Sequence, residues 1–361
     1  MFRRILVLVT SICFLFSLTG VVSAKEVEQS SKLEVLKSNL KQRTINYLIV
    51  PNPDKEIARE EGEVKFKKVI NELEGYFRST GQNVSSNLDD KDFQESILSL
   101  GGEVWSIPTE DPKQLIELIK FIDLYENYEI NEKIDVLSAK LKSDTIQERE
   151  LSELSSLAYL ADHISTLEDS NQSYENNVTT FAAGSNGYDP TDARDYARTW
   201  VSNTATLRNN SQFGYYSNYY NCTNCWNDCT NFVSQALMAG GMTHYTWGGI
   251  SDSDSWWYSN TGPSHSWGGA HNFYLHWRDR AGVAAYVSDL GVGDVINADF
   301  AGDGHIDHTA IITLSTGSSS SNKWLSQHTT DKKEVSTVAD WFSSGYTVYG
   351  YEMDKSENYP Y

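Results

Sequence analysis

The C-terminal half of the chain is built around one stretch, Asn227-Asp228-Cys229-Thr230-Asn231-Phe232-Val233-Ser234-Gln235-Ala236-Leu237, which is followed by Gly240-Gly241. Asn and Asp are preferred just before the first residue of a helix. Apolar residues at 232, 233, 236 and 237 recur with helical spacing, and glycines commonly end a helix. The stretch therefore predicts a helix with Cys229 in its first turn.

A cysteine in the first turn of a helix has two interpretations. The positive end of the helix dipole and the unpaired N–H groups favour the thiolate, which is the nucleophilic form. A small, buried packing residue is the alternative. Local sequence does not separate the two, so the choice depends on what the rest of the chain supplies.

Length and charge narrow the class of protein. With 361 residues, the chain is long enough for two domains. Its formal net charge of -20 argues against a general nucleic-acid binder, which needs a basic surface to displace counterions. The same charge argues against simple electrostatic attachment to an anionic surface.

The N-terminus has the pattern of an export signal. Two arginines, Arg3 and Arg4, precede an apolar run, and Val22-Ser23-Ala24 fits the rule for cleavage after small residues. We expect residues 1–24 to be a signal peptide and the mature chain to be secreted, with possible association with the cell wall. No later run is long enough to predict a membrane span.

Three cysteines remain after residue 24: Cys222, Cys225 and Cys229. In an oxidising compartment an odd number leaves one thiol over. A disulfide between Cys222 and Cys225 would leave Cys229 free. A structural zinc site formed by the three cysteines and one histidine is the alternative.

Composition divides the chain into regions. Residues 25–170 are rich in Glu, Lys, Leu and Ile with helical periodicity, which predicts an all-α region: a small domain, a cap or a spacer. Residues 171–186 have the composition of a linker. Residues 187–361 hold nine of the ten tryptophans and form the second predicted domain.

The second domain is predicted to be α+β, because helices come first and strands follow. From Gly293 the sequence period changes to that of strands, which are predicted at 295–296, 309–314, 323–328 and 346–351. His308 lies at a strand start and His328 at a strand end. If the two strands are neighbours, His308 is the base for the Cys229 thiol and His328 orients its ring, with Asp331 as the fallback for that role.

These residues resemble a known family. The block from Asp228 to Gln235 followed by Gly240-Gly241 is similar to the signature of the "putative amidase domain" family of secreted bacterial proteins, which is related to the NlpC-type peptidases and CHAP amidases. The pieces 293–296, 307–312 and 327–329 match in the same order. The resemblance covers residues 187–352 and implies a papain-like fold, Cys229 as nucleophile and His308 as base. It also implies His328 in the third position.

Other features add less specific expectations. The oxyanion hole needs a side-chain donor beside the Cys229 backbone N–H, and Asn227 and Tyr220 are candidates. Asp299, Asp303 and Asp307 have the composition of a calcium loop. Ala301 and Ala310, however, stand where an EF-hand requires oxygen ligands, so acidic turn residues at strand ends are expected rather than a metal site. No cofactor is expected.

The sequence thus predicts a secreted cysteine amidase or peptidase that cleaves an amide bond through a Cys229 thioester. The expected substrate is peptidoglycan or a secreted peptide. A non-catalytic, cell-wall-associated binding protein that retains the fold is the main alternative.

Overall fold

The structure is a computed structural model of the whole chain. It describes residues 33–38, 40, 54–80, 84–157, 166–169, 185–204, 213, 228–259 and 261–358. The predicted signal peptide, the disulfide candidates Cys222 and Cys225, and the oxyanion candidates Tyr220 and Asn227 lie outside these residues. Among the described residues no helix is both long and apolar enough to cross a membrane.

The N-terminal region is helical, as the sequence predicts. Its elements are α2 (Lys55–Ser79), α3 (Lys91–Leu98), the 3₁₀ helix η1 (Gly101–Ser106), α4 (Pro112–Glu126), α5 (Tyr128–Lys142) and α6 (Glu148–Leu157). Three helices begin after an aspartate whose carboxylate accepts backbone N–H groups of the first turn: Asp54, Asp90 and Asp111. Pro112 at the first position of α4 has no N–H to leave unpaired.

In the C-terminal region most α-helices come before the strands of the main sheet. Its helices are α7 (Pro190–Thr199), α8 (Cys229–Ala239), α9 (His265–Gly268), α10 (Ala270–Arg280) and α11 (Val338–Ser343), with 3₁₀ helices η3 (Val287–Asp289), η4 (Ser320–Asn322) and η5 (Met353–Lys355). Its strands are β1 (Tyr245–Thr246), β2 (Ser255–Trp256), β3 (Gly282–Ala284), β4 (Val295–Asp299), β5 (His308–Ser315), β6 (Lys323–Gln327), β7 (Lys332–Thr337) and β8 (Thr347–Glu352). The predicted α+β class is confirmed.

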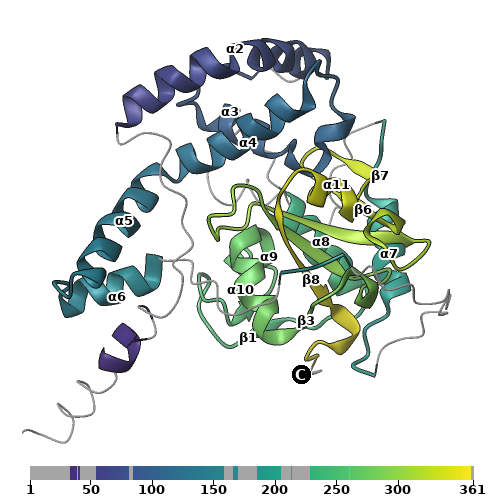
Figure 1. Ribbon diagram of the computed structural model, residues 1–361. Helices are drawn as coiled ribbons and strands as arrows, with labels where there is room; N and C mark the ends of the chain where they lie inside the picture. Colours follow the sequence, from purple (N-terminus) through teal and green to yellow (C-terminus); the bar gives the residue numbers. More distant parts are fainter. Residues whose placement is uncertain are drawn as a thin grey trace, which may run out of the picture.

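Six of these strands form one antiparallel sheet in the order β3-β8-β4-β5-β6-β7. β5, β6 and β8 agree with the sequence prediction within one residue at each end, and β4 continues three residues past its predicted end. β3 and β7 were not predicted, because β3 has three residues and the start of β7, Lys332-Lys333-Glu334, is charged. The sheet lies between the N-terminal helices on one face and α7, α8 and α10 on the other (Figure 1).

Both faces of the sheet are buried, which follows from the alternation of side chains along a strand. Val295, Ile311 and Tyr351 belong to the core that also contains residues of α7, α8 and α10. Their neighbours on the opposite face, such as Ile296 and Ile312, belong to a second core. This explains why β5 reads as a continuous apolar run rather than as a half-polar strand.

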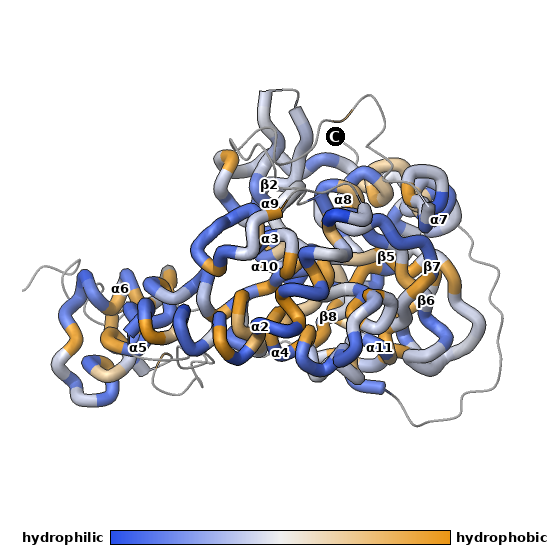
Figure 2. Tube along the Cα trace, turned by 90° about the horizontal axis from the view of Figure 1, so that it is seen from above, coloured by the Kyte–Doolittle hydropathy of each residue, from blue (hydrophilic) through white to orange (hydrophobic). Residues whose placement is uncertain are grey.

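The second core joins the two halves of the chain. It contains Leu73 of α2, Ile97 of α3 and Ile119 of α4 together with residues of β4, β5 and α11. Of the three roles that the sequence left open for the N-terminal helices, α2, α3 and α4 fill the role of a cover over one sheet face. α5 and α6 extend away as an arm (Figures 1 and 2), with a separate small core around Ile134, Leu137 and Leu154 that also includes Leu40.

The shared core yields a stability prediction. Ile119→Ala removes a fully buried side chain from α4 and should lower the free energy of unfolding by about 2–5 kcal/mol. Because the core spans both regions, the signals of helices and sheet should be lost together in one transition. Thermal unfolding followed by far-UV and near-UV circular dichroism measures this. Val64→Ala on α2, at a side chain 80% exposed, is the control and should be close to neutral. Two separate transitions in the wild type would contradict a shared core.

Candidate active site

Cys229 is the first residue of α8, as the sequence predicts, and only 6% of its surface is exposed. Its Sγ lies 3.5 Å from the Oγ1 of Thr230. The Thr230 hydroxyl in turn lies 2.8 Å from that of Thr309 on β5, which fixes the start of the helix to the central strand. The thiol is therefore held where helix and sheet meet.

His308 begins β5, opposite Ala298 of β4. It is 2% exposed, and the rings of Phe300 and Trp341 pack around it. Burial would raise the pKa of the Cys229 thiol. The charge of His308, a hydrogen bond to its ring, and hydrogen bonds with Thr230 and the Thr309 backbone outweigh burial and leave this pKa below its ordinary value. The two residues thus form a thiol–imidazole pair.

The group that holds the His308 ring is Gln327, the last residue of β6. His308 Nε2 lies 3.1 Å from Gln327 Oε1. Because the amide oxygen can only accept, this contact assigns the proton of neutral His308 to Nε2 and leaves Nδ1 as the ring atom for the thiol. Gln327 occupies the place that the sequence analysis gave to His328. Gln327 directly precedes His328 in the sequence, but a glutamine indicates a catalytic partner less clearly than a histidine does.

His328 has different partners. Its Nδ1 lies 3.1 Å from Asp228 Oδ2, and its Nε2 lies 2.6 Å from the carbonyl oxygen of Trp200. The ring stacks on Phe232 with centroids 4.0 Å apart. Both ring nitrogens of this completely buried residue are thus taken by acceptors, so His328 is not placed to orient His308. The fallback residue, Asp331, lies 3.9 Å from His328 Nε2 and contacts the same histidine.

The Asp228–His328 pair ties the start of α8 to the end of β6. Asp228 is the N-cap residue of α8, but its carboxylate accepts no helical N–H; it faces His328 and receives the Asn231 amide at 2.6 Å. Burial lowers the pKa of His328, yet the hydrogen bond to Asp228, with the charge of Asp331, outweighs it and raises that pKa above 6.5. The pair is a structural ion pair next to the thiol.

A chain of polar contacts lies behind the Cys229–His308 pair. The Asn297 amide on β4 donates to the Thr309 hydroxyl at 2.8 Å and to the His308 carbonyl at 3.1 Å. All three residues are buried. These contacts fix the backbone of β5 at the histidine, so the His308 ring is oriented from two sides.

The tryptophans divide between core and surface. Trp256 and Trp267 are fully buried, and their rings pack together with centroids 4.8 Å apart. Trp267 also donates its ring N–H to Asn231 of α8 at 2.6 Å, so it supports the cysteine helix. Trp247 is 71% exposed.

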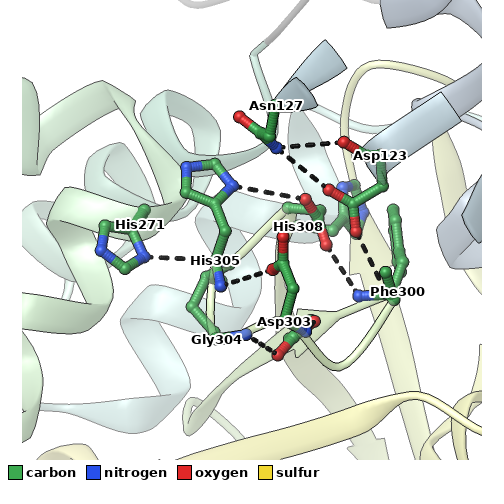
Figure 3. Close-up of polar contacts among 12 residues, drawn as sticks. Asp123, Asn127, His271, Phe300, Asp303, Gly304, His305 and His308 are labelled. Carbon is green, nitrogen blue, oxygen red and sulfur yellow. Dashed lines mark hydrogen bonds and ion pairs between the residues drawn. The ribbon is translucent and has the colours of Figure 1, made fainter. Parts of the chain in front are cut away.

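Acidic residues gather at a second place, where α4 meets the β4–β5 loop (Figure 3). Oxygens of Asp123, Asp299 and Asp303 lie within 4.8 Å of one another, and a second such set joins Asp123 with His305 and Asp307. From the sequence, Asp299, Asp303 and Asp307 are expected to be acidic turn residues without a metal role. The sequence does not predict that Asp123 joins these residues, because it belongs to a helix far away in the chain.

Comparison with known proteins supports an amidase-like domain. Residues 187–351 match the family described as "Putative amidase domain". This range contains Cys229, His308 and Gln327 and begins at the predicted domain boundary. No solved structure matches the chain.

Two curated relatives come from Bacillus subtilis (strain 168), and both are named as uncharacterized. The chain is 38% identical to YhbB over 90 residues, which is 24% of this chain and 28% of YhbB. It is 29% identical to YjcM over 179 residues, which is 46% of this chain and 36% of YjcM. The chain thus matches about a third of each relative's length, and the likeness extends to part of each protein only.

The Asp228–His328 pair predicts a pH-dependent stability. Because the pKa of His328 is higher in the folded state, the pair contributes fully below pH 6.5 and is lost as pH rises through the folded-state pKa. His328→Gln should lower the free energy of unfolding by about 3–5 kcal/mol at pH 6 and by less at alkaline pH. Urea unfolding between pH 6 and 9 measures this, with His265→Gln, at a half-buried histidine, as the control. An equal loss at every pH would contradict a charged His328.

Proposed function

We propose that this protein is a cysteine-dependent amide hydrolase in which Cys229 is the nucleophile, His308 the base and Gln327 the orienting residue. The observation that carries the proposal is the convergence of three buried side chains from α8, β5 and β6, in which the histidine lowers the pKa of the thiol. A cysteine at the start of a helix and a histidine on an adjacent antiparallel sheet are arranged as in papain-like enzymes. The match to the amidase domain supports the reaction class.

The reaction is an acyl transfer in two steps. The Cys229 thiolate attacks the amide carbonyl, and His308, which has taken the thiol proton, gives it to the departing amine. Water then attacks the thioester while His308 accepts its proton, and the acid leaves as the thiolate is restored. Gln327 accepts a hydrogen bond from Nε2 throughout, so the ring keeps the orientation that both steps require.

The start of α8 stabilises the oxyanion in this proposal. The first N–H groups of a helix have no intrahelical partner, and the helix dipole adds positive potential there. Cys229 is the first residue of an eleven-residue helix, so its own N–H is one of these groups. The side-chain donors that the sequence suggested, Asn227 and Tyr220, remain candidates outside the described residues.

The proposed place of action is outside the cell. The N-terminal segment with Arg3, Arg4 and the Val22-Ser23-Ala24 cleavage pattern supports export. An exported amide hydrolase meets peptidoglycan, whose stem peptides and sugar–peptide links are amides. We therefore propose a peptidoglycan amide as substrate class. The alternative is a cell-wall binding protein that keeps the fold; the buried arrangement of Cys229, His308 and Gln327 supports the enzyme instead.

Loss of the thiol should abolish activity. Cys229→Ala removes the nucleophile and should reduce amide hydrolysis by at least about 10³-fold without changing thermal unfolding. Purified peptidoglycan is digested with wild type and variant, and mass spectrometry of the released fragments identifies the bond. In a background with Cys222→Ser and Cys225→Ser, iodoacetamide should alkylate Cys229 faster than a free cysteine at pH 6–7. Undiminished hydrolysis by Cys229→Ala would refute the mechanism, and ordinary alkylation rates would favour the binding protein.

Gln327 is held from behind by η1, and this gives a test of its role. A Cβ at Gly102 would lie 2.4 Å from Gln327 Oε1, so Gly102→Ala must push the end of this side chain from its place. Gly102→Ala and Gln327→Ala should each lower kcat at least about tenfold and shift the pH profile of Cys229 alkylation upward, with little effect on KM.

The control is Gly75→Ala on α2, where an added Cβ meets nothing within 4 Å. It should leave kcat and the alkylation profile unchanged. Retention of full kcat in Gln327→Ala would exclude a positioning role for this residue.

A further inference from the structure

The acidic cluster at the β4–β5 loop brings together residues from both halves of the chain. Asp299, Asp303 and Asp307 lie in or beside the loop, and Asp123 comes from α4 (Figure 3). Asp123, Asp299 and Asp303 are each 1% exposed or less. Their carboxylate oxygens converge within 4.8 Å. Like charges at such distances repel one another strongly when water is excluded.

Basic side chains do not neutralise this cluster. Among the described residues, no lysine or arginine forms an ion pair with any of the four aspartates, and the one histidine contact joins His305 Nδ1 to Asp307 Oδ1 at 3.6 Å. Lys120 acts on Asp299 from a distance, but its ammonium group donates to the carbonyl of Gly345. Backbone N–H groups of the loop donate to the carboxyl groups of Asp123, Asp299 and Asp307 but carry no net charge themselves.

An independent observation comes from Asn131 on α5. This residue is 1% exposed, and its amide lies against the cluster, with Nδ2 at 3.5 Å from Asp303 Oδ2. Its carbonyl oxygen Oδ1 is buried and has no hydrogen-bond partner. A buried amide oxygen without a donor is costly. A cation among the carboxylates would satisfy it, because the amide could then present its oxygen inward.

We propose that this cluster binds one calcium ion. Asp123, Asp299 and Asp303 supply carboxylate oxygens, Asn131 supplies its amide oxygen, and Asp307 lies at the edge of the site. Calcium takes six to eight oxygen ligands in flexible geometry, with water completing the set. The predominance of oxygen donors favours calcium over zinc, which prefers nitrogen and sulfur in a tetrahedral arrangement.

The ion acts as a clamp between two parts of the chain. Ala301 donates its backbone N–H to Asp123 Oδ2 at 3.1 Å across a separation of 178 residues. A cation at the same place fastens α4 and α5 to the loop whose last residue, Asp307, precedes His308. Calcium therefore stabilises the docking of the N-terminal helices and the segment that leads into β5.

The test is calcium binding to the purified, chelator-treated chain. Titration calorimetry with calcium chloride should show one ion per chain, and calcium should raise the Tm above that in EDTA by at least about 4 °C. Asp123→Asn and Asp303→Asn should abolish both effects. Glu126→Gln, a carboxylate lost from the same helix one turn away, should retain them. In EDTA, Asp123→Asn should be at least as stable as wild type, because a repelling charge is gone.

The proposal is overturned by any of the following results. One is the absence of a calcium-dependent heat and Tm shift in wild type. Another is an unchanged calcium response in Asp123→Asn. The third is a Tm of Asp123→Asn below that of wild type in EDTA and calcium alike, which would make Asp123 a purely structural hydrogen-bond acceptor. Binding of zinc in place of calcium would refute the oxygen-ligand assignment. None of these measurements uses a substrate, so they are independent of the proposed amidase activity.

Discussion

The burial of the central sheet on both faces is the constraint on which the rest of this structure depends. One face is covered by α7, α8 and α10, and the other by helices from the first half of the chain. Strands with apolar side chains on both faces cannot remain exposed to water on either side. The N-terminal helices are therefore part of the folded unit that presents Cys229 and His308, although the sequence between the two regions has the composition of a linker.

Two buried histidines, His308 and His328, lie close together in the chain but have different environments. His308 has an uncharged acceptor at one ring nitrogen, which leaves the ring able to exchange a proton with the thiol. His328 lies between the Asp228 carboxylate and a backbone carbonyl, which holds its proton in place. A base must be able to lose its proton near neutral pH, whereas a structural cation is most useful when it does not. The environments of the two rings thus suit His308 to the proposed role of base and His328 to structural support.

Local sequence patterns predicted the helix and the strand that carry Cys229 and His308, but they did not predict Gln327 as the partner of His308. The periodicity around Phe232 and Val233 predicted α8, and the apolar run after His308 predicted β5; both are confirmed. The partner of His308 depends on the register of β6, where a shift of one residue exchanges Gln327 for His328 on a given face. The bulge between β6 and its neighbours makes this register unreadable from the sequence. Asp123 and Asn131 were equally hidden, because only the fold brings them to the loop.

The close approach of Gly102 to Gln327 joins a residue outside the matched amidase domain to one inside it. The matched domain starts at residue 187, but Gly102, which lies behind the Gln327 side chain, belongs to a different segment and also supplies a carbonyl to Trp341 beside His308. The matched domain is thus completed by a residue that lies outside it. In the proposed enzyme, a change in the N-terminal helices can therefore alter the position of Gln327, and through it that of His308, without any change inside the matched domain.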